Sequence, residues 1–101
     1  MFGVIAKLNE GKVEYVKAKE ANGILSPVVG LSFVFINVIT SPVKSFTNID
    51  ENKYLISTEN STYLCWLDEW DNIVSYSKDN GLPEPTSHKS GSFYFGFDKR
   101  F

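Results

Sequence analysis

The sequence predicts a mainly β protein: a small antiparallel β-barrel or sandwich of about six to seven short strands, with at most one short helix near residues 68–79. Three observations support this prediction. Short apolar runs recur along the chain, polar turn residues separate them, and only one segment carries apolar residues at helical spacing. At 101 residues the chain is expected to form one compact domain, residues 1–101.

Residues 2–19 are expected to form a β-hairpin. Two strand-like runs flank the short turn Asn9-Glu10-Gly11, in which Gly11 can take the positive φ that a bulged hairpin loop needs. Charged side chains along both runs mark a solvent side or protect a strand at the edge of the sheet: Lys7, Lys12, Glu14, Lys17 and Lys19.

Residues 31–40, "LSFVFINVIT", form the most apolar run of the chain. Apolar side chains occupy both alternating sets of positions, which is typical of a strand buried on both faces, so we predict the central strand here. Pro42 is expected to end it, because proline cannot donate a hydrogen bond to a neighbouring strand.

The next part of the chain is expected to be a meander of three short strands. They are predicted at residues 43–49, 53–58 and 62–67, with polar turns between them. In the last of these strands, alternation places Tyr63, Cys65 and Leu67 on one face, and Leu64 and Trp66 on the other.

Residues 67–81 fit two structures. As a helix, the segment has apolar residues at helical spacing, acidic residues at its favourable N-terminal end, and Gly81 where a helix would stop. Residues 72–77 also fit a strand. We favour the helix.

The C-terminal segment combines a loop with an aromatic strand. Residues 79–91 contain two prolines and two glycines and are predicted to be a loop. In "SFYFGFD", Phe93, Phe95 and Phe97 fall at period two and are expected to be a core strand. Tyr94 is expected to point to the opposite, solvent side, and Phe101 is either tied back to the core or free. Both are kept as candidates for contact with a partner.

The charge and the cysteine content bear on the expected partners and on the cellular compartment. The net charge is −2, and the first fifty residues carry +1 against −3 for the remainder, so nucleic acid is not expected as a partner. Cys65 is the only cysteine, and no apolar segment is long enough to cross a bilayer. We therefore expect a cytoplasmic protein without a membrane partner.

No catalytic, cofactor or metal motif is evident. His88 is the only histidine and has no acid or cysteine at a recognisable ligand spacing, and Cys65 is expected to be a buried, inert thiol. An enzyme using His88 or the acidic residues would need an enclosed pocket around them. We expect no enzyme, no cofactor and no metal site.

The densest acidic cluster, Asp68, Glu69 and Asp71, lies between Trp66 and Trp70. It could simply be the solvated start of a helix. It also fits a partner-binding surface, since tryptophan is frequent in binding hot spots and carboxylates suit a basic partner. The candidate residues are Trp66, Asp68, Glu69, Trp70, Asp71, Tyr94 and Phe101.

These features predict a non-enzymatic protein-binding module whose partner has a basic surface. An inhibitor or accessory protein of a phage or mobile element would have this small, acidic, motif-free character, although no residue demands it. A second copy of the chain, paired through an exposed strand edge, is a further partner to consider. The alternative function is a small barrel that binds single-stranded nucleic acid by stacking bases on Tyr94 and neighbouring rings.

Overall fold

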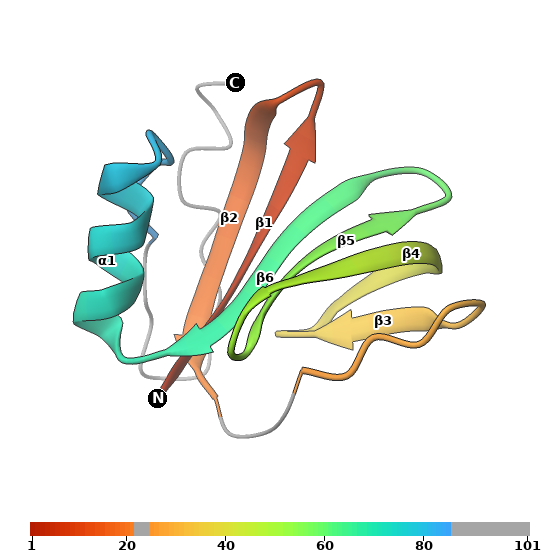
Figure 1. The fold of residues 1–101 in the computed structure, drawn as a ribbon, viewed down its shortest axis with the longest axis horizontal. Coiled ribbons are helices and arrows are strands. Elements are labelled where there is room, and N and C mark those ends of the chain that lie inside the picture. The colour runs from red at the N-terminus through yellow and green to blue at the C-terminus, as the bar shows by residue number, and fades with distance from the viewer. Residues whose placement is uncertain (22–24, 86–101) are drawn as a thin grey trace.

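The computed structural model describes residues 1–21 and 25–85 (Figure 1). The elements in chain order are β1 (Phe2–Asn9), β2 (Lys12–Glu20), β3 (Ser32–Phe35), β4 (Val38–Asp50), β5 (Lys53–Thr58), β6 (Thr62–Asp68) and α1 (Trp70–Asp79). The predicted mainly β architecture with one short helix is therefore confirmed.

The strands form one antiparallel sheet in the order β2-β1-β6-β5-β4-β3. The sheet curls into a half-barrel, and α1 stands beside β2, β1 and β6 on one of its faces (Figure 1). Each strand from β4 onward pairs with the strand before it in the sequence. β6 also pairs with β1, which joins the β1–β2 hairpin to the other strands.

Both faces of the sheet carry a hydrophobic core, because the curl covers one face and the helix covers the other. The inner core contains Ile5, Cys65 and Ile56, together with Leu25 from the segment of the chain that connects β2 to β3. The outer core lies under the helix and contains Val4, Trp66, Ile73 and their neighbours. Strands β1 and β6 contribute alternate residues to both cores, so they are buried on both faces.

The first hairpin is confirmed, with a two-residue turn. Glu10 and Gly11 both have positive φ, at 52° and 78°, which is the backbone of the turn whose twist matches that of paired strands. Asn9 pairs with Lys12 directly across it.

The prediction of one central strand at residues 31–40 is wrong. The chain turns at Ile36 and Asn37, whose φ angles are 53° and 59°, and the run becomes β3, the turn and the start of β4. β3 lies at the edge of the sheet rather than at its centre. Asparagine tolerates this backbone, but a β-branched isoleucine does so rarely, so the sequence signal for a turn was weak.

Pro42 does not end a strand, contrary to the prediction. It lies within β4, opposite Ser32, where the β3–β4 pairing is irregular. Proline is tolerated at such irregularities because no regular ladder bond is required of its nitrogen. Its carbonyl oxygen still accepts a hydrogen bond from the backbone N–H of Glu59, at 3.2 Å.

The ambiguous segment is a helix, as we favoured. α1 spans Trp70–Asp79 and buries Ile73 and Ser77 against the sheet. The predicted loop at 79–91 begins as expected, because α1 ends at Asp79 and residues 80–85 form no helix or strand. Residues 86–91 of that loop and the predicted core strand at residues 93–97 lie outside the described residues.

Candidate protein-interaction surfaces

Four of the seven candidate residues, Asp68 to Asp71, lie where β6 ends and α1 begins. Asp68 is the last residue of β6, Glu69 is the N-cap of α1, and Trp70 and Asp71 open the helix. One carboxylate oxygen of Asp68 accepts hydrogen bonds from the backbone N–H of Glu69 (2.7 Å) and from Nδ2 of Asn72 (3.1 Å). Asp68 therefore holds the chain at this corner, while the Glu69 and Asp71 side chains are exposed.

The two tryptophans differ in their accessibility. Trp66 is 1% exposed and lies in the outer core, with its ring tilted against that of Tyr76 at 5.5 Å between centroids. It therefore does not belong to an accessible surface, because β6 is covered on both faces. Trp70 is half-buried, and its ring contacts that of Phe2 at 4.9 Å.

The fold brings further carboxylates to the same corner. The β4–β5 turn lies beside the end of β6, where the backbone N–H of Leu67 donates to the carbonyl of Asn52 at 2.9 Å. Asp50, Glu51 and Asp68 thus line one open hollow of about 320 Å³. We call the five carboxylates of this corner the acidic site: Asp50, Glu51, Asp68, Glu69 and Asp71.

Within residues 1–21 and 25–85, no ion pair neutralises the acidic site. The lysine that lines the hollow is Lys53, which is only 9% exposed. Its ammonium group lies 4.0 Å from the centroid of the Tyr76 ring, a cation–π contact under the helix. Asp50, Glu51, Glu69 and Asp71 are exposed, Asp68 is partly exposed, and no cation within residues 1–21 and 25–85 forms an ion pair with any of the five.

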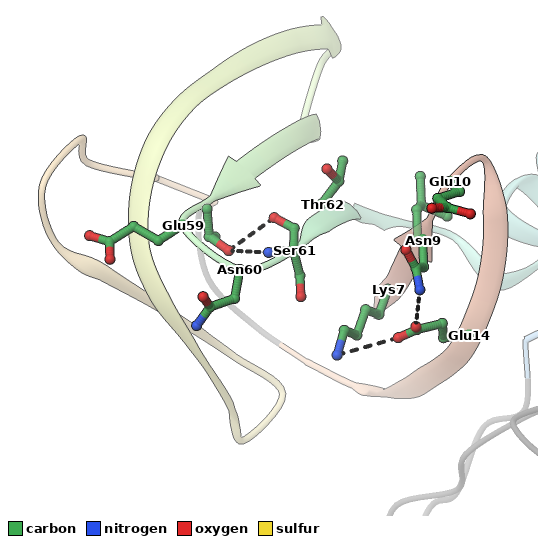
Figure 2. Close-up of a pocket in the computed structure, with 10 residues that line it drawn as sticks. Lys7, Asn9, Glu10, Glu14, Glu59, Asn60, Ser61 and Thr62 are labelled. Atoms are coloured by element: carbon green, nitrogen blue, oxygen red, sulfur yellow. Dashed lines mark hydrogen bonds and ion pairs between the residues drawn. The ribbon is translucent and has the colours of Figure 1, made fainter.

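A second hollow, of about 340 Å³, lies between the β1–β2 turn and the β5–β6 turn (Figure 2). Several of its polar groups pair with one another. Glu14 pairs with Lys7 at 3.3 Å and accepts from Nδ2 of Asn9 at 2.8 Å, while the Thr58 hydroxyl donates to the carbonyl of Ser61 at 2.9 Å (Figure 2). Because its lysine is already paired, we assign no ligand to this hollow.

Two side chains of the described part of the chain, Cys65 and Tyr15, have raised pKa values. Burial raises the pKa of the Cys65 thiol. Burial also raises the pKa of Tyr15, and the neighbouring Tyr63, which shares a hydrogen bond with it, raises it further. Among residues 1–21 and 25–85, no three His, Cys, Asp or Glu side chains are grouped to hold a metal ion.

Sequence reasoning missed an exposed apolar surface around β3. Five large side chains there are 54–73% exposed: Val28, Val29, Leu31, Val34 and Ile39. Val34 and Ile39 are cross-strand partners on the outer side of the β3–β4 hairpin. The available signal was that residues 21–43 contain no charged side chain at all.

Comparison with models of known protein families, with curated proteins and with solved structures gave no match. In the part of the chain that the structure describes, no helix has the length and apolar character needed to cross a membrane. Tyr94, Phe101 and His88 lie outside that part, so their predicted roles stay predictions.

Proposed function

We propose that this chain is a non-enzymatic protein-binding module that uses the acidic site to engage a basic surface of its partner protein. The observation that carries the proposal is the convergence of two separate segments. The β4–β5 turn and the β6–α1 corner bring carboxylates around one open hollow, and no described cation pairs with them. Such an arrangement favours a positively charged partner.

Charge alone would not hold such a complex together. Exposed ion pairs contribute about 0.2–1 kcal/mol each, so the carboxylates would mainly steer association and select the partner. Apolar contacts would supply most of the affinity. Half-buried Trp70 opens the helix next to Asp71, and Met1, which lines the hollow, is exposed. An inhibitor or accessory protein of a phage or mobile element would act in this way.

The test compares two triple variants with the same change in charge. The first, Glu51→Gln with Glu69→Gln and Asp71→Asn, neutralises exposed carboxylates of the acidic site but keeps Asp68, which holds the corner. The control, Glu59→Gln with Asp79→Asn and Glu84→Gln, neutralises three exposed carboxylates elsewhere. A protein captured by the wild-type chain is identified, purified and titrated against all three.

We expect the first variant to weaken binding by about tenfold or more, since three ion pairs are lost. The control should bind within about threefold of the wild type, a change expected of distant charges screened by salt. Circular dichroism verifies that both variants fold. Equal affinities for the two variants, or no saturable partner at all, would refute the proposal.

A further inference from the structure

The second half of β4 has a neighbour on one side only. Residues 45–48 and Asp50 pair with β5, whereas β3 pairs with β4 no further than Pro42, and Val29 bridges to Val43. Beyond Val43 no described strand occupies the outer edge of β4, and all seven residues from 44 to 50 are exposed. An edge of this kind presents unpaired N–H and C=O groups to another strand.

This edge of β4 lacks the charged side chains that usually prevent an edge strand from pairing with another chain. β2, at the far side of the sheet, carries five charged residues along its nine. Residues 44–50, "KSFTNID", carry charge only at the two ends, Lys44 and Asp50. Between them Phe46 is 40% exposed and Ile49 is 46% exposed. The centre of this edge is therefore open to pairing.

We propose that a second copy of the chain adds to this edge, with the two β4 strands antiparallel about a two-fold axis at Thr47. In that register Lys44 of each copy lies opposite Asp50 of the other, so two opposite-charge pairs form at the ends. Phe46 of each copy then lies opposite Asn48 of the other, so the uncharged residues between Lys44 and Asp50 pair with one another. A two-fold axis makes both contacts identical, as in most homodimers.

The charges select this register. Over the regularly paired residues 45–48, alternate side chains point to opposite faces, so the register there can shift only in steps that keep each side chain on its face. Centring the pair on Phe46 or Asn48 instead would place Lys44 opposite an asparagine, Asn48 or Asn52, and both charged pairs would be lost. A net charge of only −2 leaves little general repulsion between copies.

This inference goes beyond the proposed function, although the two share Asp50, which also lines the acidic hollow. Lys44 does not line that hollow and is therefore the first residue to change. The β4–β5 pairing is irregular between Val43 and Ser45 and again between Asn48 and Asp50, so exchange of charge is a better test than a distance at either end of this segment.

The experiment measures the monomer–dimer equilibrium of the purified chain by sedimentation over a wide range of concentration. The wild type is expected to dimerise. Lys44→Glu and Asp50→Lys should each raise the dimer dissociation constant by about tenfold or more, because two attractive pairs become repulsive. The double variant, Lys44→Glu with Asp50→Lys, should return to within about threefold of the wild type. The two single changes shift net charge in opposite directions, so a general charge effect cannot weaken both.

Two further variants complete the test. Lys12→Glu makes the same charge change on β2 and should leave the equilibrium unchanged. Thr47→Lys sets like charges on the two-fold axis and should abolish the dimer while the monomer stays folded. A wild type that is monomeric throughout, or a dimer indifferent to residues 44 and 50, would overturn this inference. Partner binding at the acidic site would then still stand on its own experiment.

Discussion

At the residue scale, the hydroxyl group of Ser77 is buried without a hydrogen-bond partner among residues 1–21 and 25–85. Ser77 is 1% exposed and lies on the side of α1 that packs against the sheet. Burying an unsatisfied polar group is unfavourable, and alanine is the better helix former.

Ser77→Ala should therefore raise the free energy of unfolding by about 1 kcal/mol, measured by urea denaturation. Ser75→Ala is the matched control, since Ser75 is exposed on the same helix and offers only the gain in helix propensity. If Ser77→Ala is the less stable of the two variants, the Ser77 hydroxyl has a partner and the packing of α1 described above is wrong.

Tyr15 and Cys65 make stability depend on alkaline pH. Their pKa values are raised in the folded chain above the ordinary 10.0 and 9.0, so the unfolded chain loses these protons first. Their contribution is complete below those ordinary values and is lost as the pH rises beyond them. Urea denaturation should show unfolding free energy falling above about pH 9. Tyr15→Phe, which has no proton to lose, should fall less steeply; an identical slope would contradict the burial of Tyr15.

At the element scale, β1 and β3 are held together although they are far apart in the sheet order. A Cβ added at Gly3 of β1 would lie 2.7 Å from Cζ of Phe35 in β3 and 3.0 Å from Cδ2 of Leu67. The Phe35 ring thus crosses the inside of the curl and packs on the β1 backbone, which closes this end of the half-barrel.

Gly3→Ala should lower the free energy of unfolding by about 1–3 kcal/mol through overpacking. The cost should shrink in a Phe35→Leu background, where the crowding atom is absent. A double-mutant cycle in thermal or urea denaturation measures this coupling. Strictly additive effects would show that Gly3 and Phe35 do not touch.

Elements with strong local signals were predictable from the sequence, and those that depend on an unusual backbone were not. The residues Asn9-Glu10-Gly11 predicted the turn of the first hairpin, and the polar residues at 50–52 and 59–61 predicted the turns between the later strands. Ile36 gave no such signal, because isoleucine at positive φ is rare. A strand at the edge was therefore mistaken for the central one.

The acidic site was predictable only in part, for a related reason. Asp68, Glu69 and Asp71 are close in sequence, so their clustering needed no tertiary structure. Asp50 and Glu51 join them only because β5 pairs with β6 and carries its turn to the same corner. Trp66 was predicted to be accessible but is buried, because both faces of β6 are covered by a core. Alternation of side chains does not by itself show that both faces are covered.

At the scale of the whole molecule, charge is segregated along the chain. Residues 51–85 carry seven carboxylates against two lysines, whereas β1 and β2 contain most of the lysines of the described chain. Of the two lysines in the acidic part, Lys53 is buried and Lys78 lies in the last turn of α1, away from its acidic start. Under the protein-binding proposal, these carboxylates would orient a positively charged partner as it approaches.

The most direct test of the protein-binding proposal is the association rate constant of the purified partner at low and high salt. For the wild type it should be fast at low salt and fall as salt is added. Neutralising Glu51, Glu69 and Asp71 should lower the low-salt rate constant by about tenfold or more and flatten its salt dependence, with little change in dissociation. An association rate that is unchanged by these substitutions and insensitive to salt would contradict the proposal.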